Sequence, residues 1–142
     1  MADACAEIVR LTHDYALAND SFEVEEVVGL FASDGVFDMR PIGLGVYAGH
    51  DEIRDFFERE KRALTHVMHL TTNHRIDLDP GGEEASGTVY YLAIGVVRRS
   101  GEENQSRGYY EDRYVRTAAG WRFRSRVGHS LIPWEPARVG SS

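Results

Sequence analysis

The stretch from Val67 to Asp79 holds the residues most able to do chemistry. If it forms a β-strand, its side chains alternate between two faces of a sheet. One face presents hydrogen-bonding groups in a row, namely the imidazole of His69, the hydroxyl of Thr71 and the amide of Asn73. We expect this row to line a cavity in which His69 moves protons, because imidazole gains and loses a proton most readily near neutral pH. The opposite face is mostly apolar and carries Met68, Leu70, Thr72, His74, Ile76 and Leu78.

The elements that must position this row begin with three predicted helices. Residues 3–19 have apolar side chains at helical spacing behind a candidate N-cap, Asp3. A second helix is expected next, with Asp20 or Ser21 as its cap. A third is expected from about residue 50 to residue 64. The apolar faces of the second and third helices are Val24, Val27, Val28 and Phe31, and Ile53, Phe56, Phe57 and Leu64.

Strands are predicted to follow the helices. Ser33–Gly35 is expected to turn, and a short strand is expected just after it. Beyond residue 65 the apolar period changes from helical to twofold, which predicts strands at about 67–78, 86–98, 106–117 and 120–132. Helices followed by long sequential strands indicate an α+β fold with a sheet curled around the helices. The length predicts one domain over residues 1–142, with residues 135–142 a loose tail.

Composition narrows the classes of function. The chain is 42% hydrophobic and 27% charged, which is ordinary for a globular domain. Its net charge of −7 argues against nucleic-acid binding, which needs a basic face. The single cysteine fits a reducing compartment, and no apolar run is long enough to span a bilayer. We therefore expect a cytoplasmic protein with no nucleic-acid or membrane partner.

Five motifs carry a family resemblance: Tyr15–Asp20, Leu30–Phe37, Gly45–Gly49, His69–Asn73 and Tyr114–Phe123. Together they resemble the NTF2-like superfamily over about residues 5–132, most strongly its SnoaL-like branch of dehydratases and dehydrochlorinases. That branch includes scytalone dehydratase, hexachlorocyclohexane dehydrochlorinase and a bile-acid dehydratase. The resemblance implies an NTF2-like cone, in which three N-terminal helices pack in a strongly curved antiparallel or mixed sheet around a deep pocket. Enzymes, binding modules and transport factors share this fold, so the fold alone does not decide the function.

The resemblance also implies roles for four residues. The aspartate that ends the first helix of these lyases falls on Asp20, and their strand histidine falls on His69. In such a dyad the imidazole removes a proton from substrate carbon while the carboxylate fixes its orientation. The pocket tyrosine of the family falls on Tyr47, and an arginine near the final tryptophan falls on Arg116.

Structural interpretations of these residues stay open. The residue types alone favour a structural histidine at His69 and a helix cap at Asp20, whereas the resemblance favours the dyad. Asn73 would either hold a substrate oxygen or brace the sheet. Tyr47 and Tyr15 would either donate hydrogen bonds to a leaving hydroxyl or an enolate, or simply pack.

Two further residues complete the candidate site. Arg116 would either stabilise a leaving anion or join a charged strand face. His129, on the same side of the last strand as Trp121 and Phe123, is a candidate for the pocket mouth. The alternating Arg122, Arg124 and Arg126 are expected on the charged exterior of the sheet or at a subunit contact.

Metal chemistry is not expected. The nearest histidines along the chain are His66 and His74, three positions before His69 and five positions after it. Because both separations are odd, strand alternation puts each of them on the face opposite His69. No His-x-His pair or helical pair with a carboxylate partner is present in the sequence. We therefore expect neither a metal nor another cofactor.

These observations predict a cofactor-independent lyase, most simply a dehydratase, that acts on a small hydrophobic or cyclic substrate. A polyketide cyclase or a ketosteroid-type isomerase is the alternative, and a non-catalytic ligand-binding or assembly module is the second. Ketosteroid isomerases carry a carboxylate base at the end of the first short strand, where the preferred register places Met39 rather than Asp38. A curled sheet leaves an outer face to cover, so a homo-oligomer, either a trimer or a dimer, is also expected.

Overall fold

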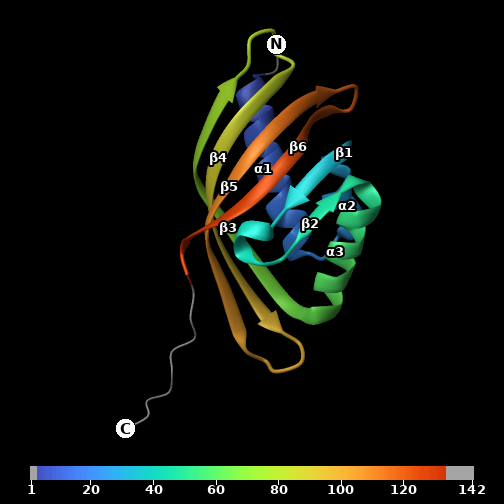
Figure 1. Ribbon diagram of the computed structural model, residues 1–142, viewed down its shortest axis with the longest axis vertical. Coiled ribbons are helices and arrows are strands. Elements are labelled where there is room, and N and C mark those ends of the chain that lie inside the picture. The colour runs from blue at the N-terminus through green and yellow to red at the C-terminus, as the bar shows by residue number, and fades with distance from the viewer. Residues whose placement is uncertain (1–2, 134–142) are drawn as a thin grey trace.

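The computed structural model describes residues 3–133, which form three α-helices and one six-stranded sheet (Figure 1). The helices are α1 (Ala4–Asp20), α2 (Val24–Gly29) and α3 (Gly49–Ala63), with a short 3-10 helix η1 (Arg40–Ile42). The strands are β1 (Phe31–Asp38), β2 (Val46–Ala48), β3 (Leu64–Leu78), β4 (Glu84–Val97), β5 (Glu103–Thr117) and β6 (Gly120–Ile132). The tail predicted at residues 135–142 lies outside the described residues.

The sheet has the strand order β2-β1-β6-β5-β4-β3. All neighbouring strands are antiparallel except β1 and β6, which are parallel. Figure 1 shows the long strands curving across α1, with α2 and α3 beside β1 and β2. The predicted α+β class and the curved mixed sheet are therefore confirmed. Among residues 3–133, no helix is both long enough and apolar enough to cross a membrane.

Helix α1 delivers one half of the expected dyad. Asp3 caps its start, because the backbone N–H of Cys5 donates to Asp3 Oδ1 at 3.0 Å. Its buried face includes Ile8, Leu11 and Tyr15, which pack into the common core. Asp20 is the last residue of α1 and not the cap of α2, which starts after Glu23 without a side-chain cap. The Asp20 carboxylate is therefore not used as a helix cap.

Strand β3 contains a β-bulge that changes which side chains face the helices. Thr72 pairs with Tyr90 and Arg75 pairs with Thr88, so that Asn73 and His74 together oppose one residue of β4. Asn73 has a φ of 51°, a left-handed conformation that asparagine tolerates better than most residues. The bulge reverses the alternation, so the prediction of regular alternation from Val67 to Asp79 is wrong beyond Thr72.

A second irregularity lies in β6. Tyr114 pairs with Phe123 but Arg113 pairs with Ser125, so Arg124 is an extra residue in the ladder. Phe123 is buried before this point and Arg126, with 0% exposure, is buried after it. The expectation that Arg126 lies on the sheet exterior is therefore wrong, and the reason is the same reversal of faces.

Candidate active site

A cavity of about 580 Å³ lies between the helices and the concave face of the sheet. This volume is within the usual range for small-molecule sites. Most of its wall is apolar, with residues such as Phe37, Met39, Phe56 and Val67. The polar side chains in its wall are Tyr15, Asn19, Glu60, His69, Tyr91, Asn104, Gln105, Ser106, Arg107, Tyr110 and Ser130.

His69 and Asp20 meet at the edge of this cavity. The Nδ1 of His69 lies 2.7 Å from Asp20 Oδ1, and the backbone N–H of His69 donates to Asp20 Oδ2 at 3.0 Å. Both carboxylate oxygens of Asp20 therefore hold the same residue. Only 9% of the His69 side chain is exposed, so this contact is shielded from bulk water. The fold brings together two residues that are 49 positions apart in the sequence.

The contact also sets the tautomer of the imidazole. An ionised carboxylate only accepts hydrogen bonds, so Nδ1 must carry the proton that is donated to Asp20. In the neutral ring Nε2 is then left with a lone pair, on the side of the ring away from Asp20. Because His69 lines the cavity, this nitrogen is available to take a proton from a bound molecule.

Three tyrosines form a second polar group in the cavity wall. The Tyr15 and His69 rings meet edge to face with their centroids 6.2 Å apart, and Tyr110 stacks on Tyr91 at 4.2 Å. Burial raises the pKa of Tyr15 to about 12, although the nearby charge of Arg126 opposes this shift. Burial likewise raises the pKa of Tyr110 well above its ordinary value. Both phenols therefore keep their protons at neutral pH and serve as hydrogen-bond donors.

A buried ion pair supports these tyrosines. Arg126 donates from Nε and Nη2 to the two oxygens of Asp112, each at 2.9 Å, and both side chains are 0% exposed. The guanidinium carbon lies 4.4 Å from the ring centre of Tyr15, 3.9 Å from that of Tyr110 and 4.2 Å from that of Phe123. Cation–π contacts of this kind hold aromatic rings in place. The Arg126 cation therefore fixes the two tyrosines from behind the cavity wall.

The ion pair continues into a hydrogen-bonded chain that ends at His74. Tyr114 donates to Asp112 Oδ2 at 2.8 Å, and His74 Nε2 lies 2.9 Å from the Tyr114 oxygen. Since the Tyr114 proton points to Asp112, the imidazole must donate from Nε2. Burial lowers the pKa of His74, partly opposed by the charge of Asp112. His74 therefore has a structural role, at the far end of a network that starts under Tyr15 and Tyr110.

This lowered pKa predicts a loss of stability in mild acid. The unfolded chain has a histidine of ordinary pKa, about 6.5, and so binds more protons than the folded chain below that pH. The His74 contribution to the free energy of unfolding is full above about pH 6.5 and decreases as the pH falls toward the lower folded-state value. His74→Gln, which keeps an N–H donor, should weaken this dependence. Urea unfolding at about pH 7 and about pH 5 measures it; an unchanged pH dependence in the variant would contradict the assignment.

Among the other residues predicted for the site, Tyr15 lines the cavity but Tyr47 and Asn73 do not. The Tyr47 hydroxyl donates to the carbonyl of Leu44 at 2.6 Å and accepts from Arg59 at 3.0 Å, behind the cavity wall. Asn73 lies in the β3 bulge and is exposed, because the left-handed backbone there directs it away from the helices. The structure therefore does not bring these two side chains to His69.

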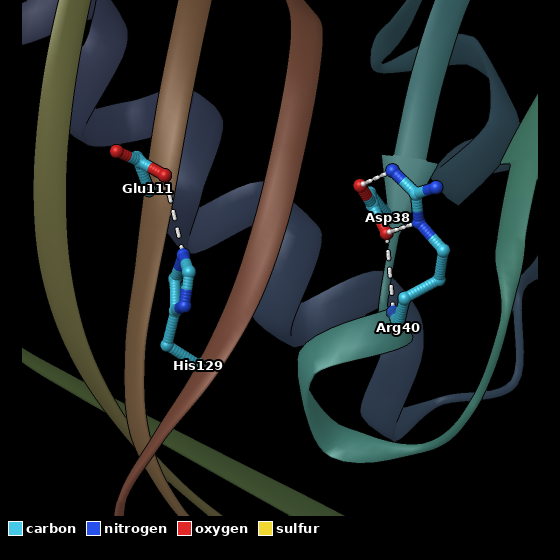
Figure 2. A network of polar contacts seen from close by, with 4 residues as sticks. All are labelled: Asp38, Arg40, Glu111 and His129. Carbon is cyan, nitrogen blue, oxygen red and sulfur yellow. Dashed lines mark hydrogen bonds and ion pairs between the residues drawn. The ribbon is translucent and has the colours of Figure 1, made fainter.

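Arg116 and His129 also lie elsewhere. Arg116 is exposed near the hairpin between β5 and β6, with its guanidinium 5.5 Å from the Trp121 ring centre. His129 stacks on Tyr109 and lies 3.2 Å from Glu111, on the outer face of the sheet. Figure 2 shows this pair in front of the strands, with the helix behind them. The expectation that His129 reaches the pocket mouth fails because the β6 irregularity reverses the faces.

At the end of β1, Asp38 and Met39 were the two candidates for the position at which ketosteroid isomerases carry their carboxylate base. Met39 is buried and lines the cavity. Asp38 lies on the outer side, where Arg40 donates to its two oxygens at 3.0 and 2.8 Å (Figure 2). The guanidinium of Arg40 also lowers the pKa of Asp38. The cavity therefore has a thioether, and not a carboxylate, at this position.

Sequence reasoning missed several wall residues, of which Glu60 had the clearest signal. Glu60 follows Phe56 and Phe57 by four and three positions, so it lies on the apolar stripe of α3. A charged residue on an apolar stripe indicates a site. The sequence indicated Tyr110 less clearly, through its even spacing from Tyr114, which places both side chains on the same face of the strand. Arg107 had none, because it reaches the cavity from an irregular end of the sheet.

Three helices inside a curved mixed sheet, around a cavity bordered by the hydrogen-bonded pair of His69 and Asp20, define a cone of the NTF2-like superfamily. The family model for the SnoaL-like domain matches residues 1–127. The chain therefore belongs to the SnoaL-like family. An uncharacterized protein of Mycobacterium tuberculosis is 27% identical over 122 residues, which cover 85% of this chain and 81% of that protein.

Solved structures agree with this assignment. A Novosphingobium aromaticivorans protein provisionally named an aromatic ring hydroxylase is 31% identical, with a TM-score of 0.86 over 90% of this chain and 89% of its own. A protein of that species provisionally named a scytalone dehydratase is 22% identical, with a TM-score of 0.84 over 100% and 99% of the chains. Hexachlorocyclohexane dehydrochlorinase type 3 from Novosphingobium barchaimii is 18% identical, with a TM-score of 0.80 over 96% and 92%. The last two likenesses concern the fold alone.

Proposed function

We propose that this protein is a cofactor-independent lyase that eliminates water from a small, largely apolar cyclic substrate. The observation that carries the proposal is the 2.7 Å contact between His69 Nδ1 and Asp20 Oδ1 beside the cavity. A base oriented by a partly buried carboxylate is suited to removing a proton from carbon. The structural likeness to proteins named as a dehydratase and a dehydrochlorinase agrees with this reaction class.

In the proposed reaction His69 Nε2 takes a proton from the carbon beside a substrate carbonyl. Asp20 steadies the imidazolium through the Nδ1–H bond. The phenol of Tyr15, which keeps its proton and accepts from Tyr110, donates a hydrogen bond to the oxygen where negative charge develops. The leaving group then departs from the neighbouring carbon, and the apolar wall excludes competing water.

Double-bond isomerisation or polyketide cyclisation is the competing reaction class. Met39 argues against a ketosteroid-type isomerase, because it lies in the cavity wall at the position where those enzymes carry a carboxylate base. A binding module without catalysis is less well supported, because a lone binding pocket does not need an imidazole with its tautomer fixed by a carboxylate. Cyclisation would begin with the same proton abstraction by His69, but it forms a carbon–carbon bond and does not expel a leaving group.

The reaction class is tested with cyclic β-hydroxy ketones, chlorinated cyclohexanes and steroid enones, incubated with the purified protein in deuterated water. Elimination gives a product lighter by water or hydrogen chloride. Isomerisation gives a product of unchanged composition apart from exchanged deuterium. Tight binding of these compounds with no turnover of any would support the binding module instead.

Asp20→Asn tests the positioning carboxylate. The amide oxygen can still accept from the backbone N–H of His69, but the amide NH2 can only donate to the ring. The ring proton must then move from Nδ1 to Nε2, which removes the lone pair that the proposed base needs. We expect the turnover number to fall about 10²-fold, at the low end of general acid–base effects, with a smaller change in KM. Steady-state kinetics with the best substrate measures the changes in kcat and KM separately. Asp14→Asn, an exposed change on the same helix, is the control; equal kinetics for the two variants would argue against the dyad.

We also propose that the outer face of the sheet binds a second copy of the chain. Met68, Leu70 and Tyr90 are 46%, 50% and 42% exposed on neighbouring strands. Exposed apolar side chains grouped in this way are typical of protein interfaces. Sedimentation of the purified protein distinguishes a monomer from the dimer or trimer expected from the sequence.

A further inference from the structure

Among residues 3–133, Glu60 is the one carboxylate in the cavity wall. It lies on α3, whereas His69 lies on β3, so the two side chains enter the cavity from different elements. The preceding Arg59 points elsewhere and donates to Tyr47 behind the wall. Glu60 also borders a small recess shared with Asn19 and Glu23. Its side chain is therefore placed to touch a molecule that also touches His69.

The surroundings of Glu60 make its charged form less favourable than that of an exposed glutamate. Burial raises its pKa, and the charges of Arg59 and His69 oppose this shift. No hydrogen-bond donor among the described residues contributes to holding the charged form. A half-buried carboxyl without such a donor is a better proton donor near neutral pH than an exposed one. A positive charge on His69, in the wall of the same cavity, would favour the carboxylate form of Glu60.

We propose that Glu60 is the general acid of the elimination, opposite His69 as the base. This inference rests on the proposed function and deepens it. Neither Asp20 nor the tyrosines can replace Glu60 in this role, because Asp20 is engaged with His69 and the pKa values of Tyr15 and Tyr110 are raised by burial.

The proton balance closes without a further reactant. His69 Nε2 takes the proton from carbon, and the electrons of the C–H bond form the new C=C bond. The C–O bond breaks with its electron pair on oxygen, and that oxygen takes the carboxyl proton of Glu60, so that water leaves. The site then holds imidazolium and carboxylate, and transfer of one proton from His69 to Glu60, directly or through water, restores it.

This assignment narrows the substrate class. Hydroxide is a poor leaving group and needs a proton, whereas chloride or a carboxylate leaves without one. A carboxylic acid on the wall would therefore favour a substrate with a hydroxyl β to its carbonyl over a halogenated one. A cyclic β-hydroxy ketone fits the apolar cavity of about 580 Å³.

The test compares two leaving groups on one ring system. The probes are a tetralone with a hydroxyl β to its carbonyl and the acetate ester of that compound, both corrected for spontaneous elimination. Glu60→Gln should lower kcat/KM for the hydroxy compound about 10²-fold and lower that for the acetate far less, because acetate leaves unprotonated. His69→Ala should lower both. Glu52→Gln, an exposed change on the same helix, should lower neither.

The outcomes separate this inference from the proposed function. An equal loss on both compounds, or no loss on either, would overturn the role of Glu60 while leaving His69 as the base. If the wild-type protein eliminates neither group, the proposed function fails and this inference fails with it. Urea unfolding checks the fold: Glu60→Gln should not be destabilised at neutral pH, since the substitution removes a carboxylate whose charged form burial disfavours.

Discussion

Replacing His69 with alanine is expected to lower the turnover number of the proposed elimination about 10³-fold, within the usual range for a general base. The reason is the single lone pair that Asp20 leaves available at Nε2. Because the base acts in the transition state, kcat and kcat/KM should fall together. Steady-state kinetics on the best substrate of the panel gives the size of the effect.

Two controls make this result specific. His66→Ala removes an exposed imidazole from the same strand, three positions earlier, and should leave turnover unchanged. Added imidazole should partly restore the activity of His69→Ala, because the truncation leaves space for the ring at the cavity wall. Turnover near the wild-type value in His69→Ala would remove the central claim of the proposed function.

The largest expected effect on stability comes from Asp112→Ala. This change leaves the guanidinium of Arg126 enclosed by Tyr15, Tyr110 and Phe123 without its bidentate partner. Breaking one side of a buried pair typically costs about 3–5 kcal/mol, because the remaining charge is desolvated and uncompensated. We therefore expect the free energy of unfolding to fall by about that amount in urea titrations.

Two comparisons distinguish an unpaired charge from loss of packing. Asp14→Ala breaks the exposed pair with Arg10, whose side chains are 82% and 46% exposed, and should change stability by less than about 1 kcal/mol. Asp112→Leu combined with Arg126→Met removes both charges and should be more stable than Asp112→Ala. A double variant as unstable as Asp112→Ala would assign the cost to packing instead.

Helical segments and the fold class could be predicted from the sequence. The apolar spacing along residues 3–19 and around Phe56 and Phe57 depends only on the helical repeat, and the structure has α1 and α3 at these places. The change to a twofold period placed the long strands to within a few residues. The segment Ser33–Gly35, expected as a turn, lies inside β1, at an irregularity of its pairing with β6 between Phe31 and Val36.

The sequence also contained the one pair of residues that meets as the resemblance implied, His69 and Asp20. Their distance depends on the end of α1 meeting β3, which is a tertiary contact. The catalytic role of the pair stays a prediction. Tyr47, Asn73, Arg116 and His129 had suitable residue types but lie outside the cavity wall.

Local sequence therefore determined the types of element, the fold class and a short set of candidate chemical groups. Tertiary structure decided which candidates share a cavity, through the irregularities in β3 and β6. A strand keeps its twofold period only while its hydrogen-bond ladder is regular, and one extra residue reverses every face beyond it. The extra residues in the two strands direct Asn73 and His129 away from the cavity, bury Arg126 and turn the half-buried His74 toward Tyr114. A bulge forms where a long strand must bend around α1 while paired with its neighbours, and this requirement comes from the assembled sheet and not from the local sequence.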